Sequence, residues 1–102
     1  MSCKKNECSS GQDRVLVREL HINNRYGIHA RPAALIVKTA LMFEADITIE
    51  KGNIKVSGKS IMGLMTLEAG RGSKVKVSAE GVDAEQALDE IQKLFDQKFH
   101  EE

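Results

Sequence analysis

The feature that most constrains the fold is a strand-turn-strand pattern near the middle of the chain, at residues 45–58. Ile47 and Ile49 alternate with polar residues, and Ile54 and Val56 do the same after a Lys-Gly-Asn turn. A period of two predicts strands with one apolar and one polar face, and the glycine supplies the positive φ that a tight hairpin needs. The pattern therefore predicts a hairpin with one face on a core.

The segments on either side of this hairpin alternate between strand and helix patterns. Strands are expected at residues 15–22 and 74–80, and helices with an apolar stripe are expected at 30–40, 60–67 and 83–99. The order is β-α-β-β-α-β-α, in which the hairpin links two β-α-β units. We therefore expect an α+β fold of the open-faced sandwich type. It would have a four-stranded, mostly antiparallel sheet, three helices on one face and water on the other.

Two polar residues stand out within these patterns. Arg18 is one of them, because alternation puts it on the same face of the first strand as the apolar Leu16 and Leu20. Asp83 precedes the last helix, and Gln86 follows three residues later, which predicts a variant of the capping box.

The length of 102 residues fits a single domain. Residues 1–12 are polar and are expected to form a flexible tail, and residues 13–102 are expected to form the folded domain. Cys3 and Cys8 both lie in the tail, with no histidine nearby at ligand spacing. Two cysteines are too few for a zinc site, so we expect inert thiols, no metal and no cofactor.

The charge balance argues against nucleic acid as a partner. Basic and acidic residues number 15 each, without a run of one sign, and there are only three Phe, one Tyr and no Trp. No apolar segment approaches the roughly 20 residues that span a bilayer, and the N-terminus lacks the hydrophobic run of a secretory signal. We therefore expect a cytoplasmic protein with no membrane insertion.

A histidine stands where the first long helix is expected to begin. Pro32 is favoured in a first turn, which puts His29 at the N-cap, a position usually held by Ser, Thr, Asp or Asn. The N–H groups of the first turn and the helix dipole bind anions, and the dipole favours a neutral, nucleophilic imidazole. A phosphoryl group on that ring would lie over the N–H groups of Ala30 and Arg31, within reach of the Arg31 guanidinium. The pattern therefore predicts an anion site that would suit a carrier of phosphoryl groups, and the alternative at this point is that His29 is an ordinary loop residue.

The segment GIHARPAALIVKTA resembles the active-site signature of the histidine-containing phosphocarrier (HPr) family of the bacterial phosphoenolpyruvate-dependent sugar phosphotransferase system. The likeness continues through GKSIMGLMTLEAGRGSKVKVSAEG and covers the chain from about Val15 to Phe99. It implies an HPr-like fold, transfer from Enzyme I to His29 and onward to sugar-specific IIA proteins or domains, and an assisting role for Arg31. The chain would then be a carrier with a covalent phosphohistidine rather than a free-standing enzyme. Tyr26 departs from the small or polar residue common in the family, which leaves partner choice open.

Ser60 opens the second expected helix. Serine is a good N-cap, so capping alone would explain it. The resemblance of KSIMG implies instead a regulatory site for HPr kinase/phosphorylase, where such a kinase is present. A phosphate at a helix N-terminus is tolerated, so its charge of roughly −2 would act on docking. Because both helices follow strands in equivalent halves of the pattern, we expect His29 and Ser60 on the same edge of the sheet.

The second helix is expected to carry a docking surface. At 100° per residue its apolar residues split into two groups, and only Leu64 and Leu67 need to face the core. The other group, an adaptable apolar patch, is Ile61, Met62 and Met65. The resemblance implies that partners contact this patch together with the first helix, including Ala34.

Other functions remain open at this point. One is a carrier of the nitrogen-related branch, with the same chemistry but another donor and acceptor. Another is a regulatory HPr-type module that is controlled at Ser60 and is not coupled to sugar transport. The KSIMGLM segment favours the sugar type, and the presence of His29 argues against the family's purely regulatory member, in which this histidine is replaced. An RNA-binding role is disfavoured by the neutral charge and few aromatics. His21 and His100 are expected to be structural, and the chain is expected to be a monomer.

Overall fold

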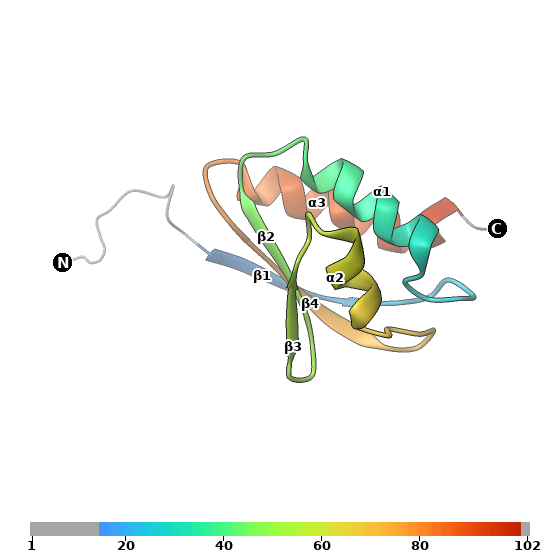
Figure 1. Cartoon of the computed structure of the whole chain (residues 1–102). Helices are drawn as coiled ribbons and strands as arrows, with labels where there is room; N and C mark the ends of the chain where they lie inside the picture. Colours follow the sequence, from blue (N-terminus) through green and yellow to red (C-terminus); the bar gives the residue numbers. More distant parts are fainter. Residues whose placement is uncertain (1–14, 101–102) are drawn as a thin grey trace.

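The structure is a computed structural model that describes residues 15–100 (Figure 1). The expected tail at residues 1–12, with Cys3 and Cys8, lies outside the described residues. The strands are β1 (Val15–His21), β2 (Asp46–Lys51), β3 (Ile54–Ser57) and β4 (Lys74–Glu80). The helices are α1 (Ala30–Ala40), α2 (Ile61–Thr66) and α3 (Ala84–Asp96), followed by one 3-10 turn at Lys98–His100.

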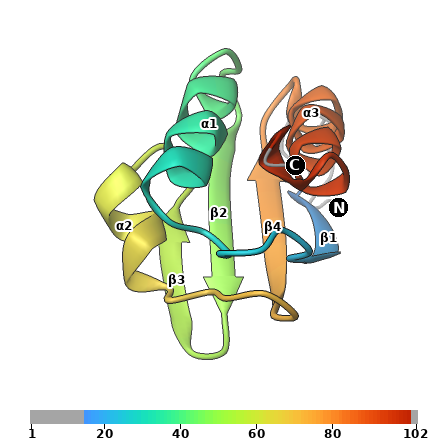
Figure 2. The same ribbon diagram turned by 90° about the vertical axis from the view of Figure 1, so that its right-hand side faces the viewer.

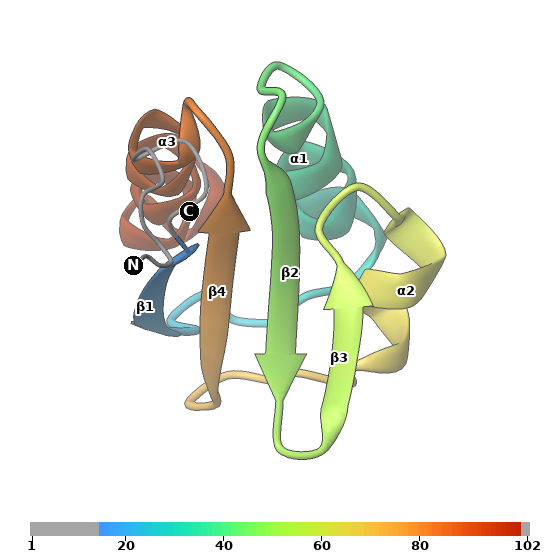
Figure 3. The same cartoon turned by 90° about the vertical axis from the view of Figure 1, so that its left-hand side faces the viewer.

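The four strands form one sheet in the order β1-β4-β2-β3, and every neighbouring pair is antiparallel. All three helices cover the same face of this sheet, as Figure 2 shows. The opposite face is left open by the described residues, as Figure 3 shows. The open-faced α+β sandwich expected from the order of the patterns is therefore confirmed.

The core lies between the sheet and the three helices. Alternate strand positions supply one wall, and the apolar stripes of the helices supply the other. The largest fully buried apolar side chains are Phe95, Phe99, Ile22, Ile36, Ile49, Leu64, Leu67, Leu88, Ile91, Val75 and Val77. Ile54 is an exception to the expected alternation, because it is 46% exposed in a four-residue strand at the edge of the sheet. Its neighbour Val56 is half-buried and packs against the core.

Arg18 occupies an apolar-parity position because it joins β1 to α3. The Nη1 atom of Arg18 donates to Gln92 Oε1 at 2.9 Å and lies 2.8 Å from Asp89 Oδ1. The guanidinium thus bridges the edge strand and the helix above it, and its aliphatic stem can lie along the core. Arg18 therefore breaks the apolar pattern of β1 because it makes a polar contact between the sheet and α3.

Asp83 is the N-cap of α3, but its side chain makes no bond to its own helix. Its two carboxylate oxygens accept hydrogen bonds from the backbone N–H groups of Glu44 and Ala45, each at 2.9 Å. The predicted capping box is therefore wrong, because the carboxylate ties the loop before β2 to the loop before α3. The Glu44 hydrogen bond first, then that of Ala45 and the charge of Lys59, lowers the pKa of Asp83 below its ordinary value.

We expect the substitution Asp83→Ala to lower the free energy of unfolding at pH 7. Since the folded carboxylate has the lower pKa, its contribution is complete above the unfolded pKa of about 3.9 and is lost as the pH falls through the folded value. Urea denaturation of both proteins between pH 7 and pH 2 measures this difference, which should shrink on acidification. An Asp96→Ala control removes an exposed carboxylate and should show no such convergence. A wild-type advantage over Asp83→Ala that stays constant down to pH 2 would contradict the assignment.

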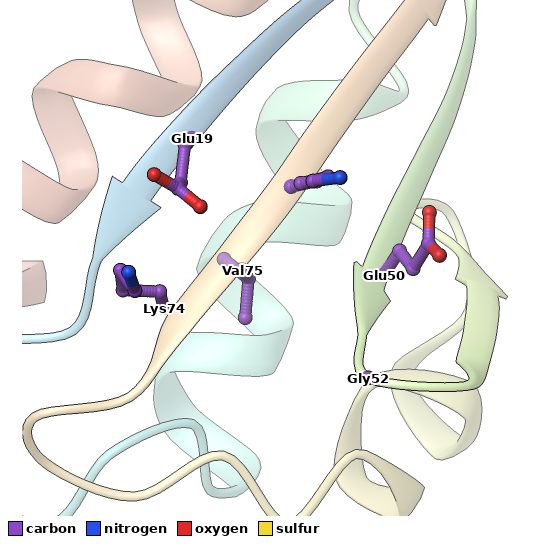
Figure 4. Close-up of a pocket in the computed structure, with 6 residues that line it drawn as sticks. Glu19, Glu50, Gly52, Lys74 and Val75 are labelled. Atoms are coloured by element: carbon purple, nitrogen blue, oxygen red, sulfur yellow. The ribbon is translucent and has the colours of Figure 1, made fainter.

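The open face of the sheet carries a row of alternating charges that crosses all four strands. Glu19 pairs in register with Lys76, Lys76 with Glu50, and Glu50 with Lys55. Glu19, Glu50 and the lysines of β4 surround a shallow depression of about 260 Å³, drawn in Figure 4. Opposite charges on facing positions contribute roughly 0.2–1 kcal/mol per pair. The alternation therefore suits a sheet face that stays in water.

Candidate functional site

The structure puts His29 at the N-cap of α1, as the sequence predicts. Its backbone is extended, with φ −112° and ψ −163°, and its carbonyl accepts the first helical hydrogen bond from Ala33 N at 2.9 Å. The imidazole makes no capping bond to the helix and is half-buried. The imidazole thus lies at the positive end of the helix dipole but does not cap the helix.

The loop before His29 is tied down on two sides. The fully buried Asn24 donates from Nδ2 to the Gly27 carbonyl at 2.7 Å. Ile28 N donates to the carbonyl of Ala69, beyond the C-terminal end of α2, at 2.8 Å. Asn24 and Gly27 in the sequence indicate a loop, but they do not reveal that the Asn24 side chain closes the turn. These bonds fix the backbone that carries the histidine.

Any residue other than glycine would be strained at position 27 of this loop. Its φ is +70°, a left-handed conformation that L-residues rarely adopt. A Cβ at this position would also run into the Ala69 carbonyl oxygen and lie 2.7 Å from the Gly70 Cα. The close approach that allows the Ile28–Ala69 bond therefore depends on the absence of a side chain.

We predict that Gly27→Ala destabilises the domain more than Gly52→Ala does. Gly52 has a similar φ of +60°, but a Cβ there would meet nothing within 4 Å, so that variant reports the left-handed strain alone, about 1–2 kcal/mol. The collision with Ala69 is added only in Gly27→Ala. Thermal unfolding of both variants measures the difference. Equal losses would show that the loop moves away from Ala69 at no cost.

The start of α1 is suited to an anion. The first turn holds no acidic residue, Pro32 has no N–H, and the Ala33 N–H already donates to His29. The remaining N–H groups of the turn are those of Ala30 and Arg31, which the geometry of a helix leaves without an intrahelical acceptor. Both residues are exposed, so a group attached to the imidazole could reach their N–H groups and the Arg31 side chain from solvent.

Tyr26 lies against the imidazole. The centroids of the two rings are 6.0 Å apart with an interplanar angle of 84°, an edge-to-face arrangement. The Arg25 guanidinium carbon lies 5.4 Å from the centroid of the Tyr26 ring. In the sequence Tyr26 is only a departure from the family pattern, because a contact between the Tyr26 and His29 rings leaves no periodic signal.

Ser60 and the exposed patch on α2 are placed as the helical spacing predicts. The Ser60 Oγ accepts from Gly63 N at 3.0 Å and so caps α2. Leu64 and Leu67 are buried, whereas all three residues of the predicted patch are exposed, Met62 by 80%. Ala34 is exposed as well, on α1.

The two helix starts do not share an edge of the sheet, so that expectation is wrong. Because β1-β4, β4-β2 and β2-β3 are all antiparallel, β1 and β3 run in opposite directions, and α1 and α2 start from opposite ends. Figure 2 shows the two helices running in opposite directions. The Ile28–Ala69 bond joins the histidine loop to the segment after the C-terminal end of α2. Ser60 therefore lies at the far end of a helix about 9 Å long, and Met65 lies toward the end near the histidine loop.

Other kinds of site find no support among residues 15–100. No helix in this range combines the length and the apolar character needed to cross a membrane. Nor does the same range bring together three or more histidine, cysteine or acidic side chains that could hold a metal ion.

A family model settles the classification of the chain. The PTS-HPr model, described as the phosphorylation site of the HPr component of the phosphotransferase system, matches residues 16–97. The chain belongs to the HPr phosphocarrier family. Its role is therefore that of an HPr-family phosphocarrier of the phosphotransferase system, with the sandwich fold described above.

Individual relatives agree with the family model. The phosphocarrier protein HPr of Treponema pallidum is 46% identical over 88 residues, which cover 86% of this chain and 100% of the relative. The phosphocarrier protein NPr of Shewanella violacea is 43% identical and covers 84% of this chain and 94% of its own length. The crystal structure of HPr-C-His from Thermoanaerobacter tengcongensis has a TM-score of 0.82 and 48% identity, over 85% of this chain and 98% of that one.

Proposed function

We propose that this HPr-family chain accepts a phosphoryl group on His29 from phospho-Enzyme I and passes it to sugar-specific IIA proteins or domains. The observation that carries the proposal is the position of His29, half-exposed at the N-cap of α1 and not engaged in capping. A residue that only began the helix would stabilise it better as Ser or Asp, by about 1 kcal/mol. The imidazole is therefore present for another purpose.

The chemistry needs one nucleophile and a moderate anion site. A lone pair of the neutral imidazole attacks the phosphorus, and the bond from phosphorus to the donor breaks with its electron pair left on the donor. The new anion lies over the N–H groups of Ala30 and Arg31, and the Arg31 guanidinium assists by neutralising charge. An exposed anion gains about 0.3–1 kcal/mol at a helix start. That is enough to position the group and too little to trap it before transfer to an acceptor.

We predict that His29→Ala abolishes phosphoryl uptake from Enzyme I and phosphoenolpyruvate. The fold should be retained, because the side chain is half-exposed and does not cap α1. The measurement is incorporation of labelled phosphate, followed by its release in acid and retention in alkali, as a P–N bond requires. His21→Ala and His100→Ala, at the two other histidines, serve as matched controls and should label normally. Wild-type labelling of His29→Ala would refute the assignment.

We extend the proposal to regulation at Ser60. Its Oγ is half-buried at the N-terminus of α2, and the exposed patch of Ile61, Met62 and Met65 begins at the next residue. A phosphate there would lie at a tolerated helix end and would add roughly two negative charges beside the docking patch. Since Ser60 stands at the far end of α2 from the histidine loop, it would act on docking rather than on the imidazole.

We predict that Ser60→Asp slows the phosphorylation of His29 by Enzyme I and leaves the fold intact. Ser60→Ala should react at nearly the wild-type rate, although loss of the cap to Gly63 lowers stability by about 0.5–2 kcal/mol. Initial rates at sub-saturating Enzyme I compare the two variants with wild type, and rates at saturating Enzyme I should converge. An Asp variant as fast as wild type at low Enzyme I would leave Ser60 as a cap only.

We also propose that the chain is cytoplasmic and monomeric, with the apolar patch on α2 open to successive partners. A second candidate, a carrier of the nitrogen-related branch, is favoured by the 43% identity with the Shewanella phosphocarrier protein NPr. The KSIMGLM segment favours the sugar branch. Rates of transfer from purified Enzyme I of each branch distinguish the two.

A further inference from the structure

Tyr26 is a large aromatic residue that the fold leaves 66% exposed, yet its ring is packed against a specific neighbour. The contact with His29, at 6.0 Å and 84°, has the edge-to-face geometry that aromatic pairs prefer over face-to-face stacking. The side chain adds nothing to the core. Its contact with the imidazole is therefore the feature to explain.

The position of Tyr26 is fixed from both sides. On one side its backbone enters the turn that is closed by the Asn24 Nδ2 bond to the Gly27 carbonyl and by Gly27 N donating to Asn24 O at 3.4 Å. On the other side the Arg25 guanidinium lies over its ring at 5.4 Å, in reach of a cation–π interaction. Tyr26 thus lies in contact with Arg25 and with His29.

An imidazole at an N-cap has a broad, soft torsion about its Cβ–Cγ bond. A half-turn about this bond exchanges the positions of Nδ1 and Cδ2 and those of Nε2 and Cε1, so it changes where each ring nitrogen lies relative to the helix N–H groups. A second ring held at its side restricts that rotation. It also covers part of the imidazole from water.

We propose that Tyr26 is a positioning residue for His29. Its ring holds the imidazole in the orientation from which a phosphoryl group reaches the N–H groups of Ala30 and Arg31, and Arg25 holds Tyr26 in turn. This inference rests on the proposed phosphorylation of His29. The ring, and not the phenol hydroxyl, performs this role, so phenylalanine should replace tyrosine and alanine should not.

The first experiment uses the unphosphorylated protein and needs no donor. The imidazole proton and nitrogen resonances of His29 are compared by NMR in wild type, Tyr26→Phe and Tyr26→Ala. In Tyr26→Ala the His29 proton resonances should move toward those of His21 and His100, the two exposed histidines, which serve as references in the same sample. In Tyr26→Phe they should stay close to wild type.

The second experiment measures how long the phosphorylated protein survives without an acceptor. In hydrolysis a water oxygen forms a bond to phosphorus, the P–N bond breaks, the nitrogen keeps the electron pair, and inorganic phosphate leaves. If the contact is worth what aromatic pairs usually are, the half-life should fall roughly two- to tenfold in Tyr26→Ala. It should change less than about twofold in Tyr26→Phe. Arg25→Gln should give a smaller loss than Tyr26→Ala.

The results separate the possible failures. Unchanged His29 resonances and an unchanged half-life in Tyr26→Ala would overturn the positioning role, and so would a Tyr26→Phe variant that behaves as Tyr26→Ala. A wild-type protein that Enzyme I cannot phosphorylate would refute the proposed function instead. The NMR comparison would still show whether the Tyr26 ring contacts the imidazole.

Discussion

The hydrogen bond from the Ile28 N–H to the Ala69 carbonyl is the contact on which the geometry of the site depends. It joins the loop that carries His29 to the segment that follows α2, although the two residues are far apart in the chain. Gly27 makes this approach possible, and Asn24 holds the other side of the turn. The Ile28–Ala69 bond places the loop before α1 next to the segment after the C-terminal end of α2, the end of the helix on which the exposed Met65 lies.

The starts of α1 and α2 differ in how the N-cap side chain treats the helix. The Ser60 Oγ accepts a hydrogen bond from the Gly63 N–H and caps α2, whereas the His29 side chain makes no capping bond to α1. A missing cap costs about 1 kcal/mol, which a compact core can supply. The N–H groups of Ala30 and Arg31 can then bind an anion that is attached to the imidazole.

Patterns within one segment were enough to predict the fold and part of the site. The period of each segment gave the strands and helices, and Pro32 located His29 at the N-cap. Contacts between segments were not accessible in this way. The Asp83 carboxylate binds backbone N–H groups about forty residues earlier, so its local capping pattern was misleading. The relative direction of β1 and β3 follows only from strand pairing, and the Tyr26 contact depends on a turn whose shape the sequence did not define.

The central claim is that a phosphoryl group on His29 is received by the start of α1. The most direct test is the change in backbone amide ¹H and ¹⁵N chemical shifts when the protein is phosphorylated by Enzyme I and phosphoenolpyruvate. We expect the largest downfield amide shifts at Ala30 and Arg31. The Ala33 amide, already bonded to the His29 carbonyl, should move much less. Amides at Ala30 and Arg31 that do not shift while His29 is phosphorylated would contradict the central claim.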